Sequence, residues 1–226
     1  MDQIDLTGPF EVLSRIPNST FALLWKTLDP VRDIKGLTLT PNATLAKSGP
    51  LDVLVVPGGF GQEDLMQDTE VLAFLREQAA TAKYVFSICT GALLCGAAGL
   101  LRNVRTTTHW RSMHLLEYFG AMAEPARVVV DGKHVSAAGV TAGIDGALRL
   151  AAILRGDRTA QAIQLALEYA PEPPFQSGTP AKASTEVREM VEEQFRAIAQ
   201  RRLVTAKRFR DVAAANSHPA SPEVRA

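Results

Sequence analysis

The feature that most constrains this fold is the abrupt change of pattern around residues 84–101. Residues 84–88 (YVFSI) have the near-continuous apolar character of a strand buried on both faces, and residues 92–101 have the Ala/Leu-rich composition of a helix. Only Cys89, Thr90 and Gly91 separate the two segments. A strand that passes directly into a helix is typical of a parallel sheet covered by helices.

The rest of the chain alternates in the same way, which predicts an α/β domain with helices on both faces of a mostly parallel sheet. We expect further strands at residues 20–26, 37–40, 51–56, 105–109, 127–130 and 134–138. We expect helices that begin at Gly8-Pro9 and that cover residues 69–83, 110–119, 141–154 and 158–169. Such a domain normally opens with a buried strand, but residues 2–6 are too short for one, so either that strand is replaced or a segment precedes the start.

Beyond Pro180 the pattern changes. Apolar residues between Val187 and Ile198 keep helical spacing among many charges, which predicts a long amphipathic helix that covers the domain or a partner subunit. We therefore divide the chain into an α/β domain at residues 1–180, a C-terminal helix at 181–215 and a flexible tail at 216–226.

Composition narrows the class of protein. Lys+Arg and Asp+Glu number 24 each, and a chain without net charge gives no reason to expect nucleic acid or an anionic membrane as partner. Its apolar stretches are too short to span a bilayer. Cys89 and Cys95 lie six residues apart on one expected helix, cannot form a disulfide, and favour a reducing cytoplasm. No CxxC pair occurs and the four histidines are scattered, so we predict no metal site.

Cys89 is the sharpest candidate for chemistry. A nucleophile between a strand and a helix lies on a tight turn with its side chain above the sheet, as in the nucleophile elbow of hydrolases. The helix N-terminus is expected to lower the pKa of the thiol and to offer N–H groups to developing negative charge. The pattern alone leaves a second interpretation open, in which Cys89 is a small buried core residue. We interpret Cys95, inside the helix among Ala and Leu, as a core residue.

Other candidates are weaker by themselves. Pro57, Gly58 and Gly59 end a neighbouring strand, where sites form in open α/β sheets, and the Gly59 N–H could donate to an anion; an ordinary turn fits as well. Asp5 lies between apolar residues and could hold its proton tightly, although a loop or capping role is the commoner one. His109, His114 and Asp145 have minor chances of a direct role, because nothing local places them beside Cys89.

Six motifs, in this order, resemble those of one family. They are Asp5-Leu6-Thr7-Gly8-Pro9, Pro57-Gly58-Gly59, Ser87-Ile88-Cys89-Thr90-Gly91, Thr107-Thr108-His109-Trp110, Gly139-Val140-Thr141-Ala142-Gly143-Ile144-Asp145 and Leu167-Glu168-Tyr169-Ala170-Pro171. The chain is similar to the isonitrile (cyclohexyl isocyanide) hydratases of the PfpI-type, class I glutamine-amidotransferase-like superfamily. Several of these motifs also resemble the sensor-like domains of AraC-type regulators.

The resemblance implies a flavodoxin-like sandwich, a homodimer, and catalysis without a metal or organic cofactor. It implies that Cys89 is the nucleophile and Asp5 the acid/base, with Thr90 contacting the reacting group. It also implies that N–H groups of Gly58, Gly59 and Thr90 line an anion hole. Relatives in this family have a strand and a loop before the first motif that this chain lacks.

The reaction expected from this resemblance is hydration of an isonitrile to an N-substituted formamide through a covalent thioimidate on Cys89. An alternative is a glyoxalase-like enzyme of the same superfamily, although that branch has a histidine where Thr90 stands. A third possibility is a non-enzymatic sensor. A DNA-binding regulator would need a C-terminal pair of helix-turn-helix units, and the roughly forty residues after Pro180 do not supply one.

Overall fold

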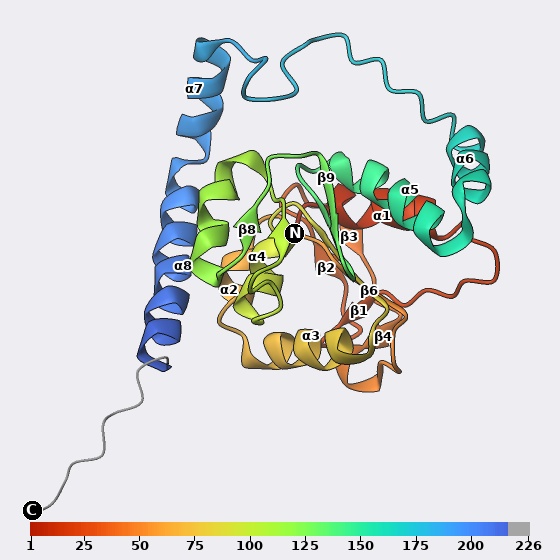
Figure 1. The fold of residues 1–226 in the computed structure, drawn as a ribbon, viewed down its shortest axis with the longest axis horizontal. Coiled ribbons are helices and arrows are strands. Elements are labelled where there is room, and N and C mark those ends of the chain that lie inside the picture. Colours follow the sequence, from red (N-terminus) through yellow and green to blue (C-terminus); the bar gives the residue numbers. More distant parts are fainter. Residues whose placement is uncertain (217–226) are drawn as a thin grey trace, which may run out of the picture.

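The computed structural model describes residues 1–216, and the side chains of residues 1–210. Its main sheet has the strand order β5 (Val53–Val56), β6 (Tyr84–Ile88), β10 (His134–Ala137) and β9 (Val128–Asp131), shown at the centre of Figure 1. β5, β6 and β10 are parallel, and β9 pairs with β10 in the antiparallel direction. The predicted α/β, flavodoxin-like sandwich with a mostly parallel sheet is therefore confirmed.

Helices cover both faces of this sheet and create two separate cores. One face carries α1 (Ile4–Leu13), α5 (Ala142–Arg155) and α6 (Asp157–Ala166), packed on Phe86 and Ile88 of β6. The other face carries α3 (Thr69–Thr81), α4 (Gly91–Ala97) and the 3-10 helix η2 (Trp110–Phe119), packed on Val85 and on Leu54 and Val56 of β5. Alternate residues of one strand thus enter different cores, as a strand buried on both faces requires.

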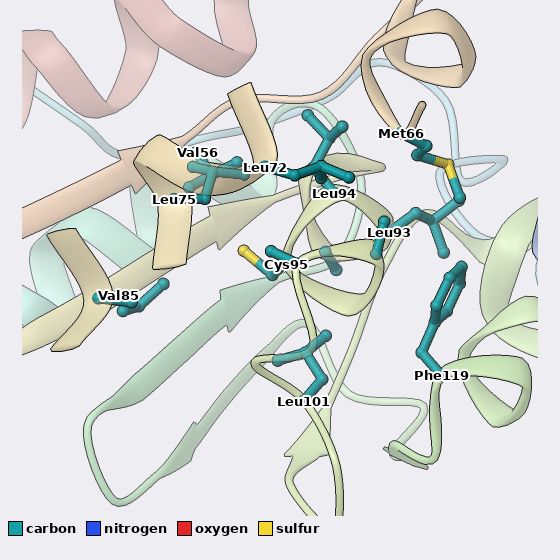
Figure 2. Close-up of a cluster of buried hydrophobic side chains, with 14 of the residues drawn as sticks. Val56, Met66, Leu72, Leu75, Val85, Leu93, Leu94, Cys95, Leu101 and Phe119 are labelled. Carbon is teal, nitrogen blue, oxygen red and sulfur yellow. The ribbon is translucent and has the colours of Figure 1, made fainter. Parts of the chain in front are cut away.

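Cys95 belongs to the second core. Figure 2 shows it among aliphatic side chains, with Val85 of the sheet and Leu101 close by, and it is fully buried. The prediction that Cys95 is a core residue is confirmed.

Several short elements complete the fold. They are β1 (Leu24–Trp25), β2 (Val31–Arg32), β3 (Thr38–Leu39), β4 (Ala43–Thr44), η1 (Leu45–Lys47), α2 (Gln62–Leu65), β7 (Arg105–Thr106) and β8 (Met122–Ala123). β1 pairs with β4, β2 with β3 and β7 with β8, in small sheets separate from the main one. Of the strand expected at residues 20–26, only Leu24 and Trp25 form a strand, β1.

The strand expected at residues 105–109 also stops early, because side chains replace strand partners beyond Thr106. The Thr107 N–H donates to the Ser136 hydroxyl, 3.0 Å away, and the Thr108 hydroxyl donates to the Cys89 carbonyl, 2.6 Å away. This segment therefore links the sheet to the turn at Cys89.

The first helix begins earlier than we expected. α1 starts at Ile4, so Pro9 lies inside the helix instead of at its first position, and residues 1–3 lead directly into the first turn. Gly143 lets α1 approach α5, since a Cβ atom there would lie 3.0 Å from the Pro9 ring. The early start places Asp5 inside the first helical turn, at the carboxyl ends of the strands.

The C-terminal region forms two helices where the sequence predicted one. α7 (Thr185–Gln194) is capped by Ser184, whose hydroxyl accepts from the Val187 N–H, and α8 (Arg196–Asn216) follows after a break at Phe195. At this break the Phe195 ring packs against Phe60 of the domain. α8 runs along η2 on the outside of the second core (Figure 1). Of the predicted tail at 216–226, residues 217–226 lie outside the described residues.

Candidate active site

Cys89 lies on a tight turn between β6 and α4. Its φ angle is +52°, in the left-handed region that non-glycine residues rarely adopt. The Cys89 N–H donates to the Ala137 carbonyl at 2.9 Å, and its carbonyl accepts from Thr108. A Cβ atom at Gly91 would lie 2.1 Å from the Val56 carbonyl oxygen, so only glycine permits this approach of α4 to β5. The surrounding backbone contacts therefore hold Cys89 in a conformation that is unfavourable for a non-glycine residue.

The Pro57-Gly58-Gly59 segment crosses directly over this turn. A Cβ atom at Gly58 would lie 2.5 Å from the Thr90 nitrogen, and one at Gly59, whose φ is +106°, would meet the Asp2 nitrogen. The ends of β5 and β6 are thus in close contact, as expected for a site at the carboxyl edge of the sheet.

Asp5 reaches the same place from the first turn of α1. Its Oδ2 atom accepts from the Gly58 N–H at 3.1 Å, and its carboxyl group also hydrogen-bonds the Cys89 thiol. Among residues 1–210, no group donates to its other oxygen, Oδ1. Burial, assisted by the charge of Asp2, raises the pKa of Asp5 to about 7. A carboxyl with this pKa can both take and return a proton near neutral pH.

The thiol itself differs from the expectation. Burial raises the pKa of Cys89, and the charge of Asp5 raises it further, whereas the Thr90 N–H and the Arg202 charge lower it. The residue is only 4% exposed, so loss of hydration outweighs the short helix that follows. The expectation that the helix N-terminus lowers the pKa of Cys89 is therefore wrong. Ionisation of this sulfur therefore depends on a base, and Asp5 is the carboxyl beside it.

The N–H groups expected to face an anion are already engaged. The Gly59 N–H donates to the Thr90 hydroxyl at 2.9 Å, the Gly58 N–H donates to Asp5, and the Thr90 N–H points to the Cys89 sulfur. In this arrangement Gly58 and Gly59 position Asp5 and Thr90. A role for Gly59 in binding an anion requires the Thr90 hydroxyl to release its N–H.

A small pocket of about 130 Å³ opens onto Cys89. Its polar side comes from Asp2, Thr90, His109, Arg111, Ser112 and Arg202, and its apolar side from Phe60, Val140, Val191, Phe195, Ile198 and Ala199. Four of these six apolar residues therefore come from the C-terminal helices and their junction. From the sequence we expected this region only to cover the domain or a partner subunit, and we predicted none of these residues at the site.

His109 contributes to the pocket, and the other two minor candidates do not. Burial and the nearby arginines lower the pKa of His109 to about 4, so its ring is neutral, and its Nδ1 atom accepts from the Arg111 N–H at 3.4 Å. His114 lies on an open groove beside α7 and not at the Cys89 pocket. Asp145 forms an ion pair with Arg127 and accepts from the Tyr169 hydroxyl, away from the pocket.

Within residues 1–210, whose side chains the structure describes, no group of three or more His, Cys, Asp and Glu side chains could hold a metal ion. No helix in the same part of the chain combines the length and apolar character needed to cross a bilayer.

Fold and site together define an α/β protein with a cysteine on a strained strand-to-helix turn, a buried carboxyl beside it and a small pocket in front of it. This chain belongs to the DJ-1/PfpI family, whose model matches residues 1–153.

Three relatives place it within that family. The chain is 51% identical over 187 residues to "Isonitrile hydratase" of Pseudomonas putida, an alignment that covers 83% of this chain and 82% of the relative. A crystal structure of a ThiJ/PfpI family protein from Pseudomonas syringae superposes with a TM-score of 0.89 and 38% identity, over 91% of this chain and 86% of the other. The HTH-type transcriptional regulator GbdR of Pseudomonas aeruginosa is 30% identical over 51% of this chain, but only 32% of its own length is covered.

Proposed function

We propose that this protein hydrates an isonitrile, R–NC, to the N-substituted formamide R–NH–CHO. The observation that carries the proposal is the Cys89–Asp5 pair, in which a buried carboxyl with a pKa of about 7 contacts a thiol at the base of a pocket. The similarity to the P. putida isonitrile hydratase, which extends over most of both chains, supports the same reaction. The enzyme is accordingly a cofactor-free hydro-lyase.

In the first half-reaction, the Asp5 carboxylate removes the Cys89 proton and the sulfur attacks the terminal carbon of the isonitrile. A C–S bond forms, and Asp5 delivers the proton to the same carbon. The product is the thioimidate R–N=CH–S–Cys89, with Asp5 again ionised. The raised pKa of the Cys89 thiol is consistent with this order of steps, because the thiol proton leaves only as the C–S bond forms.

In the second half-reaction, Asp5 takes a proton from water while the water oxygen attacks the thioimidate carbon. The proton passes to nitrogen and gives R–NH–CH(OH)–S–Cys89. Breaking the C–S bond then releases the formamide, and the hydroxyl proton returns to sulfur. We propose that the Thr90 hydroxyl, which lines the same pocket as Cys89, contacts the reacting group in both steps.

The pocket suggests the kind of substrate. Phe60, Val140, Val191, Phe195 and Ile198 surround the space beyond the sulfur with apolar groups, and about 130 Å³ accommodates a compact side chain. We propose that R is a small apolar group such as an alkyl ring. We also propose a homodimer, as the resemblance of the sequence implies, and sedimentation velocity tests it. The two free cysteines support a reducing cytoplasm as its location.

The experiment is turnover of purified protein on a panel of alkyl and aryl isocyanides, with formamide measured by chromatography. We expect formamide from the wild type and none above background from Cys89→Ala. Intact-protein mass during turnover tests the covalent step, since the thioimidate adds the mass of the isocyanide to Cys89. Lack of turnover on the panel, together with lactate formation from methylglyoxal, would overturn the proposal in favour of a glyoxalase.

A further inference from the structure

Arg202 of α8 is the most enclosed cation at the site. Its side chain is 11% exposed, its Nε donates to Glu63 at 2.5 Å, and the Glu63 side chain is itself 6% exposed. A second guanidinium nitrogen donates to the Gly59 carbonyl at 3.1 Å. The same arginine lines the pocket together with Cys89. One side chain therefore connects α8, the segment before α2 and the space in front of the sulfur.

We propose that Arg202 is a positioning residue for the Cys89 nucleophile, because it fixes the glycine turn above the sulfur and places a positive charge in the pocket. The proposal concerns the reactivity of the thiol. Only its consequence for formamide turnover rests on the proposed function.

The geometric part follows from the hydrogen bonds of the glycine turn. Arg202 holds the Gly59 carbonyl, and the N–H groups of Gly58 and Gly59 hold Asp5 and the Thr90 hydroxyl. Without Arg202 the Gly59 carbonyl keeps only the Thr90 hydroxyl, 3.4 Å away, and the glycine turn that carries both N–H donors is held less firmly. The base and the hydroxyl group beside the sulfur would then lose their fixed positions.

The electrostatic part follows from the charges that face the sulfur. Asp2 and Asp5 approach it from the N-terminal segment, His109 and Arg111 from the edge of η2, and Arg202 from α8. His109 is neutral near pH 7, and Asp5 opposes ionisation of the thiol while Arg202 favours it. Glu63 offsets part of the Arg202 charge. Removal of Arg202 should therefore raise the pKa of the Cys89 thiol, and removal of Glu63 should lower it.

Sequence patterns give no sign of this role, since Arg202 lies in a run of charged residues and beyond the residues 1–153 that match the family model. The adjacent Arg201 is exposed and does not line the pocket, which makes it a matched control on the same helix.

The test is the rate of Cys89 alkylation by iodoacetamide as a function of pH, followed by mass spectrometry of the Cys89 peptide. We expect Arg202→Gln to slow alkylation near neutral pH by about tenfold, the effect of roughly one pKa unit on the thiolate fraction. We expect Arg202→Lys to recover much of this loss and Arg201→Gln to behave as the wild type. A pocket that merely loosens would admit the reagent and speed alkylation, which would overturn the proposal.

A second pair of variants covers the case in which Arg202→Gln leaves Glu63 buried alone and the protein does not fold. Glu63→Gln keeps the cation and should shift the alkylation profile to lower pH. The double variant Glu63→Gln/Arg202→Gln, without a lone buried charge, should shift it back to higher pH. Equal profiles for these two proteins would overturn the proposal. Because alkylation requires no isonitrile, absence of formamide turnover would count against the proposed function and leave this inference standing.

Discussion

The two sides of the pocket are built by different means. The Cys89 side is made of backbone: every residue of α4 is buried, and Gly58 and Gly91 allow peptide groups to touch. The opposite side is made of side chains from the C-terminal region. Within the described part of the chain α7 has no buried residue. Phe195 and Arg202 attach the C-terminal region to the domain through a ring contact and an ion pair.

The difference indicates which side can change. At Gly58 and Gly91 an added Cβ atom would lie 2.5 and 2.1 Å from backbone atoms, so no room remains for another atom. A wall made of side chains can be rebuilt with a modest change in stability. We therefore expect the reaction to depend on the turn, and the choice of substrate to depend on the C-terminal helices. The following predictions test that division.

The largest effect is expected from Gly91→Ala. The added methyl group would lie 2.1 Å from the Val56 carbonyl oxygen, so β5 and α4 must separate. We expect the free energy of unfolding to fall by about 3 kcal/mol and turnover to disappear, as measured by urea denaturation and the formamide assay.

The matched control is Gly178→Ala, the same substitution in the exposed segment before α7, where a Cβ atom meets open space. It should change the free energy of unfolding by less than about 0.5 kcal/mol. Equal losses at the two glycines would contradict the proposed division between backbone and side-chain walls.

A second test concerns the pH dependence that Asp5 brings to the turn. Its pKa is raised to about 7 in the folded state, above the value of about 3.9 in an unfolded chain, so the folded state binds the proton more tightly. Stability is then highest at low pH for this group and is lost as pH rises from about 4 to about 7. Asp5→Asn should remove this loss, raise stability at pH 8 relative to wild type, and abolish the rise of kcat/KM through pH 7.

Urea denaturation at pH 5 and pH 8 measures the stability difference, and initial rates across the same range measure the kinetic one. Cys89→Ala keeps the buried carboxyl and should retain the pH slope of stability while losing activity. A slope that persists in Asp5→Asn would show that another group produces it.

The smallest effect on stability is expected from Val191→Ala in α7. Val191 lines the pocket but is only half-buried, so the free energy of unfolding should fall by less than about 1 kcal/mol. The wider pocket should raise kcat/KM for a bulkier isocyanide relative to a smaller one by a few-fold. Val187→Ala, one turn away, 40% exposed and outside the pocket lining, should leave this ratio unchanged.

The fold could largely be predicted because its signals are local. The strands expected at residues 84–88, 127–130 and 134–138 and the helix expected at 69–83 all formed close to their expected limits. Errors fell where tertiary contacts override a local pattern: Thr107 and Thr108 bond to side chains and the turn instead of extending a strand, and Phe195 divides the C-terminal helix.

The site could be predicted only in part for the same reason. The Cys89 turn is visible in the sequence, and the position of Asp5 followed from a resemblance to known proteins. The direction of the thiol pKa was wrong, because a helix N-terminus is visible in a sequence and the burial of a sulfur atom is not. The contribution of Phe195, Ile198 and Arg202 depends on where α8 packs, which no local pattern reveals.

The contact between α8 and the glycine turn also has a consequence for biosynthesis. Gly59 and Arg202 are separated by 143 positions, and at a translation rate of about 5–20 residues per second the arginine follows the glycine by several seconds. A nascent chain can thus assemble its sheet while the sulfur still lacks its outer wall. We therefore expect the Cys89 thiol to be more accessible to oxidants and electrophiles during that interval, until α8 packs over the pocket.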